Sequence, residues 1–173
     1  VNCSSAIEIT QNSIRLAISG SRKISAHRKN DIAAHVAIKV SGPHTKSLSF
    51  RRNVITLAPN TETTSCMGIS VTKGASISLS QCVMVGASSP QTRDAVVRTI
   101  GVQAYDCGTV GIANCSFLHL DVGIDVNDHV SVTIERSLFE SPLAAGVLLC
   151  VRSDIATRPS TRSMFICAGN TFR

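Results

Sequence analysis

Short segments of alternating hydrophobic and polar residues recur along the chain, and each begins with Gly or Ala. The segments that begin with Gly are 68–71, 101–104, 123–126 and 146–149, and those that begin with Ala are 6–9 and 37–40. A period of two is typical of β-strands, because successive side chains point to opposite faces. A helical period of 3.6 is absent, so the pattern predicts an all-β protein.

A second alternating pair follows each of these segments at a nearly fixed offset. The pairs are Leu48/Phe50, Ile77/Leu79, Val110/Ile112, Val132/Ile134 and Phe165/Cys167. Three residues after each pair comes a small or amide residue, at Asn53, Cys82, Cys115, Ser137 and Asn170. Two residues further comes a large apolar one, at Ile55, Met84, Phe117, Phe139 and Phe172. The first segment, with Ile14 and Leu16 as its pair, keeps only the first half of this register.

This repeat predicts a single-stranded right-handed parallel β-helix of about six coils. Each coil has three short strands whose inward side chains it cannot bury alone, so coils stack and form one core. We expect residues 1–173 to form one such domain, either as the whole protein or as part of a larger chain. A β-sandwich or jelly roll also has short alternating strands, but it does not require the same residue class at the same offset in five successive segments. The residues expected to point inward are Val102, Val110, Ile112, Cys115, Phe117, Ile124, Val132, Ile134 and Phe139.

Insertions are expected at one corner of the coil, between its third strand and the first strand of the next coil. They comprise segments 19–36, 56–67 and 85–100, and a separate insertion, 151–163, follows the first strand of the last coil. Loops stacked on one edge of a solenoid often form a binding surface, and tolerated loop growth is the alternative.

Composition narrows the choice of partners. The chain is 43% hydrophobic with a net charge of +6, no Trp and a single Tyr. The charge would suit an anionic partner, yet no aromatic residues are interspersed with the basic ones, which argues against a nucleic-acid surface that stacks bases. No apolar run is long enough to span a membrane. Seven Cys without any CxxC spacing indicate reduced, buried thiols rather than a zinc site or a complete disulfide framework, with Cys82 and Cys115 stacked and reduced.

Glycoside hydrolysis usually needs two carboxyl groups about 5–10 Å apart. The predicted outward positions of the first strand are Glu8, Lys39, Ser70, Gln103, Asp125 and Leu148. In this order Asp125 has no acidic neighbour, and Glu8 lies beside Lys39, with which we expect it to form an ion pair. On the second strand Glu135 lies next to Ala113 and again has no acidic neighbour.

One polar cluster remains. Asp106 and Asp128 share an offset in adjacent coils, with Cys107 and His129 one step further along the chain. Stacked Asp residues could bind calcium, or one could act as a general base. The alternative is that they form turns through backbone hydrogen bonds. Asp106, Asp128 and His129 are thus candidate metal or catalytic residues, and nothing else in the sequence indicates a metal, a catalytic residue or a cofactor.

Three segments carry a family resemblance: Asn114–Phe117, Val130–Glu140 and Gly169–Phe172. They resemble the repeats of the pectate-lyase-like β-helix superfamily, over roughly residues 6–173. That superfamily includes polysaccharide lyases, glycoside hydrolases, epimerases, phage tailspikes and β-helical virion proteins. Arg158–Arg162 departs from the Arg-x-Pro-x-x-Arg element of pectate lyases because no residue separates Arg158 from Pro159.

The sequence leaves two candidate functions. The first is a non-enzymatic structural protein of a virion, such as a capsid-decorating or spike domain, that forms a homotrimer and binds other particle proteins. The second is a carbohydrate-active enzyme or a polysaccharide-binding tailspike fragment, with an extracellular or cell-surface location. The missing carboxylate pair and the few aromatic residues favour the first.

Overall fold

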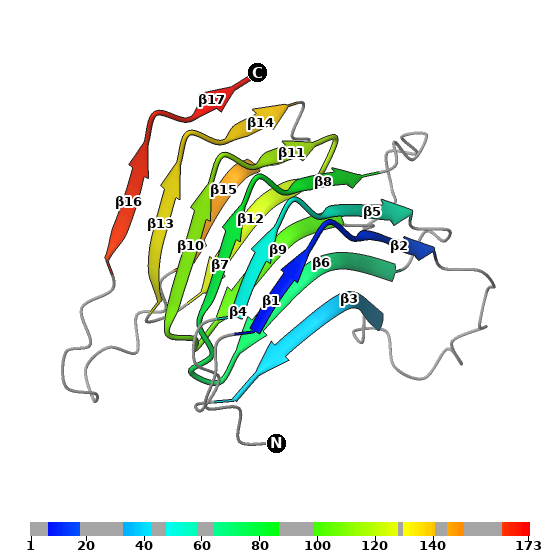
Figure 1. Ribbon diagram of the computed structural model, residues 1–173, viewed down its shortest axis with the longest axis horizontal. Coiled ribbons are helices and arrows are strands. Elements are labelled where there is room, and N and C mark those ends of the chain that lie inside the picture. Colours follow the sequence, from blue (N-terminus) through cyan, green and yellow to red (C-terminus); the bar gives the residue numbers. More distant parts are fainter. Residues whose placement is uncertain are drawn as a thin grey trace.

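The computed structural model describes residues 7–17, 33–42, 48–58, 64–86, 99–127, 130–140, 145–150 and 164–173. All regular secondary structure in these ranges is β-strand, numbered β1 to β17. The strands form three sheets, and every pair of neighbouring strands is parallel (Figure 1).

We name the sheets A, B and C. Sheet A consists of β1 (Ile7–Thr10), β4 (Leu48–Arg51), β7 (Ile77–Ser80), β10 (Thr109–Ala113), β13 (Ser131–Glu135) and β16 (Phe165–Ala168). Sheet B consists of β2 (Ser13–Ala17), β5 (Val54–Ala58), β8 (Val83–Gly86), β11 (Ser116–Leu118), β14 (Leu138–Glu140) and β17 (Thr171–Phe172). Sheet C consists of β3 (Ala33–Ser41), β6 (Thr64–Thr72), β9 (Thr99–Tyr105), β12 (Val122–Asn127) and β15 (Ala145–Cys150).

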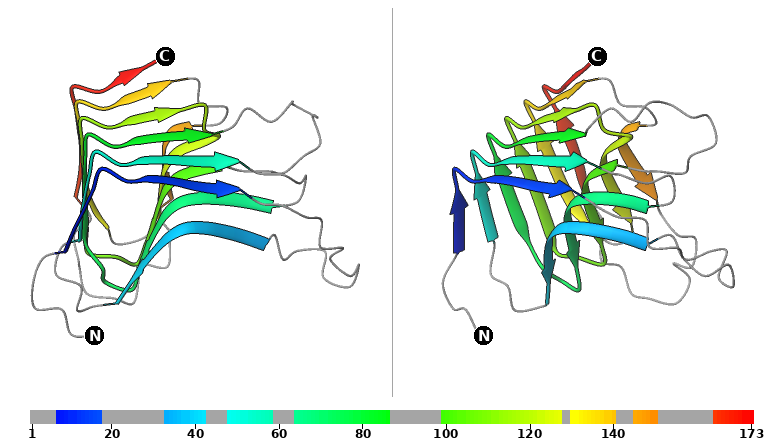
Figure 2. Two further views of the ribbon diagram at one scale, coloured as in Figure 1. Left: turned by 45° about the vertical axis from the view of Figure 1, so that its right-hand side comes forward. Right: turned by 90° about the vertical axis from the view of Figure 1, so that its right-hand side faces the viewer.

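The chain visits sheets C, A and B in turn, and each passage is one coil. Every coil rises by one strand, so β1 and β2 lie at one end of the stack and β16 and β17 at the other (Figure 2). This is the parallel β-helix that the repeat predicts. Its rigidity follows from the pairing, since the backbone of each inner coil bonds to the coils on both sides.

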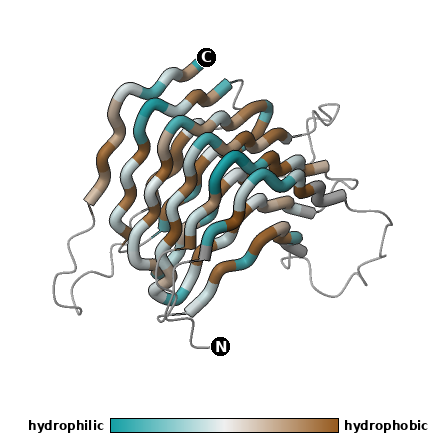
Figure 3. Tube along the Cα trace, viewed as in Figure 1, coloured by the Kyte–Doolittle hydropathy of each residue, from teal (hydrophilic) through white to brown (hydrophobic). Residues whose placement is uncertain are grey.

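The core consists of columns of like residues. Hydrophobic and polar residues alternate along the strands (Figure 3), and the hydrophobic ones meet inside. The rings of Phe117, Phe139 and Phe172 stack nearly parallel, with both centroid distances 4.9 Å, which is the spacing between strands. All nine residues predicted to point inward are buried, which confirms the register of the inner coils.

A column of small residues faces the aromatic column across the interior. It runs through Gly68, Gly101, Gly123 and Gly146 in sheet C. A Cβ placed on Gly101 would lie 2.9 Å from Cδ1 of Phe117. The large residue of each coil therefore fills the space that its glycine leaves open.

The prediction for the first coil is wrong. The sequence pattern aligns residues 6–9 with Ala37–Val40, but β1 pairs with β4 in sheet A, and β2 pairs with β5 in sheet B. The physical reason is the corner that follows: Asn12 comes three residues after Ile9, as Asn53 comes three after Phe50. Glu8 consequently lies beside Ser49, and its predicted ion pair with Lys39 is not formed.

The insertions are shorter than predicted at their edges. Sheet C strands begin at Ala33, Thr64 and Thr99, inside the predicted insertions, and β5 and β8 run to Ala58 and Gly86. The first residues of β9 lack simple alternation, because Thr99, Ile100 and Gly101 are all buried. The remaining parts of the insertions, and segment 151–163, lie outside the described residues.

Candidate functional site

Asp106 lies at the corner between sheets C and A, immediately after β9. Its side chain is exposed and its backbone has a φ of 45°. Its carbonyl oxygen accepts a hydrogen bond of 2.7 Å from the Gly74 N–H in the preceding coil. Asp128 and His129 lie outside the described residues, so the predicted stack is not tested. The bond from Gly74 fits the interpretation of Asp106 as a turn former.

Cys107, the neighbour of Asp106, points into the core. It is buried, and burial raises the pKa of its thiol to about 11. A thiol that stays protonated at neutral pH is a poor nucleophile and a poor metal ligand. Cys107 therefore adds no chemistry to this corner.

A polar cluster, hereafter the sheet C cluster, lies on the outward face of sheet C and comprises Gln103, Tyr105, Asp125 and Asn127. The Asp125 carboxylate accepts hydrogen bonds from Gln103 Nε2 at 3.2 Å and from Asn127 Nδ2 at 3.0 Å, one on each oxygen. Tyr105 pairs with Asn127 in the next strand and is 42% exposed. The cluster presents amide and phenol groups beside a carboxylate that is already bonded.

The carboxylates on the strands are separated from one another. Asp125 lies between Gln103 and Leu148, and Glu135 lies between Ala113 and Ala168. The strand register therefore gives neither residue an acidic neighbour. General acid–base hydrolysis of a glycoside would need a second carboxylate close by.

An apolar patch, hereafter the sheet B stripe, lies on the outward face of sheet B. It comprises Val54, Val83, Val85, Leu118 and Leu138, on four adjacent strands. Val54 is the most open of them, at 39% exposure. The repeat pattern does not predict this patch, because it marks only the inward positions. The hydrophobic run Val83–Gly86 does indicate it, since both faces of β8 are apolar.

The other two outward faces differ in character. The central outward column of sheet A consists of Glu8, Ser49, Ser78, Gly111, Thr133 and Ile166. That of sheet C consists of Lys39, Ser70, Gln103, Asp125 and Leu148. Only sheet B turns a group of branched apolar side chains outward among the described residues. A contiguous outward apolar group of this kind is typical of an interaction surface.

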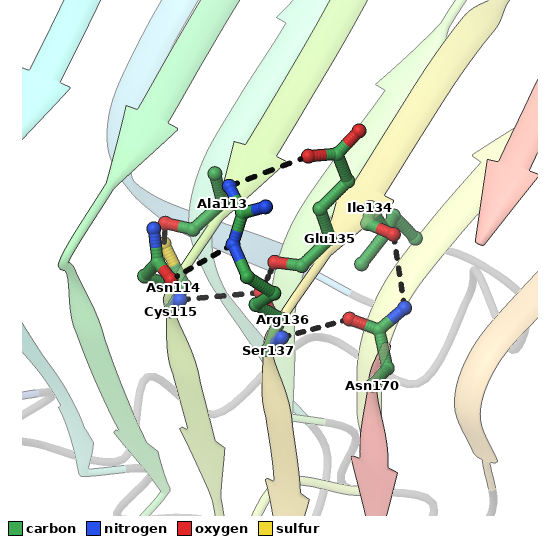
Figure 4. Close-up of polar contacts among 8 residues, drawn as sticks. All are labelled: Ala113, Asn114, Cys115, Ile134, Glu135, Arg136, Ser137 and Asn170. Atoms are coloured by element: carbon green, nitrogen blue, oxygen red, sulfur yellow. Dashed lines mark hydrogen bonds and ion pairs between the residues drawn. The ribbon is translucent and has the colours of Figure 1, made fainter. Parts of the chain in front are cut away.

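A ladder of side chains, hereafter the corner ladder, lines the corner between sheets A and B. Its members are Asn12, Asn53, Cys82, Cys115, Ser137 and Asn170. The Cys115 N–H donates to Ser137 Oγ at 3.1 Å, and the Ser137 N–H donates to Asn170 Oδ1 at 2.8 Å (Figure 4). Each step thus satisfies a buried backbone donor with a side chain from the next coil.

The residue before each ladder member has a left-handed backbone. These residues are Gln11, Arg52, Gln81, Asn114, Arg136 and Gly169, with φ between 47° and 63°. The side chains of the five that are not glycine are exposed, and Arg52 Nε donates to Gln81 Oε1 at 3.0 Å and Arg136 Nε to Asn114 Oδ1 at 3.3 Å. Arg136 also forms an exposed ion pair of 3.4 Å with Glu135. The cationic groups at this corner are therefore engaged with neighbours of the same chain.

The two thiols in the corner ladder influence each other. Cys82 and Cys115 are free and buried, as predicted. Their mutual hydrogen bond lowers the pKa of Cys82, because a thiolate there can accept the Cys115 proton, and it raises the pKa of Cys115. Both side chains also contact backbone carbonyls, with Cys82 Sγ 3.4 Å from Phe50 O and Cys115 Sγ 3.4 Å from Ala113 O. Both thiols are buried, so their hydrogen bonds contribute to the corner ladder and not to a surface site.

Within the described ranges, no three His, Cys, Asp or Glu residues come together in a way that could hold a metal ion. The same residues include no helix that is long and apolar enough to cross a bilayer. No family model, curated protein or solved structure matches the chain. The fold class therefore stands on the structure itself, and function has to be inferred from its surfaces.

Proposed function

We propose that this chain is a non-enzymatic structural protein, a virion component of the capsid-decorating or spike type, that assembles as a homotrimer on a larger particle. The observation that carries the proposal is the sheet B stripe, a group of five branched apolar side chains on one outward face of the prism. Removing such side chains from water is favourable by about 25 cal/mol per Å². Association is the direct way to do so.

A second copy of the chain is the occupant that best fits the stripe. Closed symmetry brings the same face of each subunit to the axis, so three stripes would meet one another. The members of the stripe are branched side chains on rigid strands, with Ser116 between Val83 and Leu138 and the Glu140 carboxylate beside Leu118 at the margin. The five apolar side chains themselves can be buried without the desolvation cost of a charge.

The acidic residues support the same proposal. Both oxygens of Asp125 accept hydrogen bonds from side-chain amides, and the Glu135 carboxylate is paired with the Arg136 guanidinium. Neither is placed as half of a catalytic pair. The virion assignment itself is an inference from the resemblance of segments 114–117 and 130–140 to the repeats of a superfamily that includes β-helical virion proteins.

The test is the mass of the purified chain by light scattering over a wide concentration range. We expect a trimer, and we expect Leu138→Lys, which places a charge within the stripe, to give monomers. Thr133→Lys is the matched control, because it adds the same charge to the outward face of sheet A. A wild-type chain that stays monomeric at all concentrations would contradict the proposal. Electron microscopy of the source particle, labelled for this chain, tests its place on a virion.

A carbohydrate-active or polysaccharide-binding protein at the cell surface is the second candidate. The sheet C cluster favours it, because an exposed Tyr beside Asn and Asp side chains suits the apolar face and the hydroxyl groups of a sugar. Binding to a glycan array that is lost in Tyr105→Ala, and retained in Thr72→Ala on the neighbouring strand, would favour this function.

A further inference from the structure

Cys82 and Cys115 occupy the same position in two successive inner coils. The strands on both sides of them are paired in register, β7 with β10 before the cysteines and β8 with β11 after them. Each cysteine follows an exposed residue with a left-handed backbone, Gln81 at a φ of 55° and Asn114 at 54°. Because the two backbones match, the Cβ atoms of the cysteines lie about one strand spacing apart, which is about 4.8 Å.

The two side chains also have the same orientation. Cys82 Sγ lies 3.5 Å from Ser80 O, and Cys115 Sγ lies 3.4 Å from Ala113 O, which in each case is the carbonyl two residues earlier. The sulfurs therefore project in the same direction from stacked positions. Their mutual hydrogen bond places one proton between them.

This spacing does not suit a disulfide bond. A disulfide brings the two Cβ atoms to about 3.5–4.5 Å and needs them turned toward each other. Stacked Cβ atoms at the strand spacing lie beyond that range, and parallel side chains are not turned toward each other. Closing the bond would pull two coils together at a corner that the hydrogen bonds of the ladder hold in register. The geometry therefore keeps the pair as two thiols.

The same spacing does suit one metal ion bound between the two sulfurs. Two sulfur–metal bonds of about 2.3 Å each, the length found for zinc and thiolate, span a gap of this size. Zinc takes four ligands and an iron–sulfur cluster takes four cysteines, whereas the described residues bring no third His, Cys, Asp or Glu to the pair. Thiolate ligands also select Cu(I), a closed-shell ion that accepts two ligands in a line.

We propose that Cys82 and Cys115 form a binding site for Cu(I), which is held in a line between the two sulfurs inside the prism. On binding, both S–H bonds break, two S–Cu bonds form and the two protons go to solvent, while copper and sulfur keep their oxidation states. The ion takes the place of the proton that lies between the thiols, and its positive charge offsets the repulsion between two neighbouring thiolates. The site is independent of the sheet B stripe and of trimer formation.

The surroundings of the pair favour Cu(I) over Cu(II). Cys82 and Cys115 are only 1% and 3% exposed, so water does not compete for the ion. Cu(II) prefers nitrogen and oxygen ligands in a square-planar or tetragonal arrangement, which two stacked thiols do not provide. Hydrogen bonds from the backbone of Asn53 to Cys82 and from the backbone of Cys82 to Cys115 favour thiolates at both positions. Uptake should be slow, because the ion has to pass beneath the exposed corner residues.

The corner ladder itself supplies variants that remove one sulfur and keep the fold. Cys82→Asn copies Asn53 of the preceding coil, and Cys115→Ser copies Ser137 of the following coil. Both new side chains can make the hydrogen bonds that the ladder already contains. Cys66→Ala is the control, because it removes a buried thiol of sheet C whose register neighbours are not cysteines.

The test is an anaerobic titration of the reduced chain with Cu(I), followed by native mass spectrometry and by competition with a chromogenic Cu(I) chelator. We expect one ion that resists the chelator in the wild-type chain and in Cys66→Ala. Cys82→Asn and Cys115→Ser should each weaken its binding by at least about a hundredfold. X-ray absorption of the loaded wild type should show two sulfur neighbours and no nitrogen or oxygen. Bound Cu(I) should raise the Tm of the wild type and leave that of the two ligand variants unchanged.

Three results would overturn the inference. The first is a wild-type chain that loses all its copper to the chelator as readily as the two ligand variants do. The second is a tight Cu(I) site that persists in Cys82→Asn or in Cys115→Ser. The third is a Cys82–Cys115 disulfide formed under mild oxidation of the copper-free chain, because the spacing would then suit a disulfide after all. Circular dichroism and urea denaturation of each variant confirm that the coils remain folded.

Discussion

Gly123 and Phe139 lie opposite each other within one coil, and the ring of Phe139 occupies the space that a side chain at position 123 would need. A Cβ placed on Gly123 would lie 2.7 Å from Cδ1 of Phe139 and 2.5 Å from the carbonyl oxygen of Gly146. The first contact is with a ring held between two other rings, and the second is with backbone. Neither neighbour can move without disturbing an adjacent coil.

Gly123→Ala should therefore lower the free energy of unfolding by about 1–3 kcal/mol, the usual cost of overpacking a core. Gly111→Ala is the matched control, because a Cβ there meets nothing closer than 4.0 Å. That control should be neutral or gain about 0.5 kcal/mol from a less flexible unfolded chain. Urea denaturation measures both, and equal effects would mean that the Gly–Phe contact is not formed.

The aromatic column should respond according to position. Phe139→Ala leaves a cavity between two rings and should cost about 3–5 kcal/mol. Phe172→Ala should cost much less in the isolated monomer, because only one face of its ring is covered. A thermal denaturation series of the two variants would contradict the register if the order of their effects were reversed.

The corner ladder predicts a stabilising substitution, Cys82→Asn. Asn53 Nδ2 donates to Ile9 O at 2.7 Å, and Asn170 Nδ2 donates to Ile134 O at 2.9 Å. Phe50 O is the equivalent acceptor for position 82, where a thiol now makes a weak bond. An amide there should add about 1 kcal/mol. Cys82→Val cannot donate, so chemical denaturation should show no gain for it.

Stability should fall in alkaline solution because of two buried thiols. Burial raises the pKa of Cys66 and of Cys107 to about 11 in the folded chain, while an unfolded thiol has a pKa of about 8.5. Below the unfolded value both states are protonated and the stabilisation is complete. As the pH rises toward 11 only the unfolded chain loses protons, so each thiol should cost on the order of 2 kcal/mol of stability.

The check is urea denaturation at several pH values between about 8 and 11, the interval between the two pKa values. Replacing both thiols with Ala should make the free energy of unfolding depend less on pH. The two small cavities should lower that free energy by the same amount at every pH. A slope unchanged in the double variant would show that other groups are responsible.

We expect no cleavage of acidic or neutral polysaccharides by this chain. The described strand carboxylates lie apart, and Asp106 has a backbone role at its corner. Release of reducing ends or unsaturated products measures the activity. Reproducible cleavage that disappears in Asp106→Asn or Asp128→Asn would restore the stacked Asp corner as a catalytic site.

The sequence predicts the inner coils well because their repeat has two independent markers. Val110 and Ile112 mark a sheet A strand, and Cys115 then fixes the corner, so the position of Phe117 follows. The first coil is misplaced because alternation alone does not distinguish sheet A from sheet C. The offset from Ile9 to Asn12 does contain the distinction, since it equals the offset from Phe50 to Asn53.

The surfaces are harder to predict from the sequence. The sheet B stripe is hidden in runs such as Val83–Gly86, where apolar residues occupy both faces and only the fold tells inward from outward. The sheet C cluster depends on pairing between Tyr105 and Asn127, which is a long-range register. The position of Asp106 at a corner follows from its offset in the repeat, whereas its hydrogen bond with Gly74 depends on how two coils stack.

The corner between sheets A and B has the same length in every coil. Two residues separate the strands there in all six coils, from Gln11–Asn12 to Gly169–Asn170. Adding one residue would reverse which side chains of the following strand face the core. The segments between β5 and β6 and between β15 and β16 are under no such constraint, since their lengths already differ from coil to coil. Foreign peptides grafted into those two segments should thus be displayed from the side of the prism, without shifting any strand that follows.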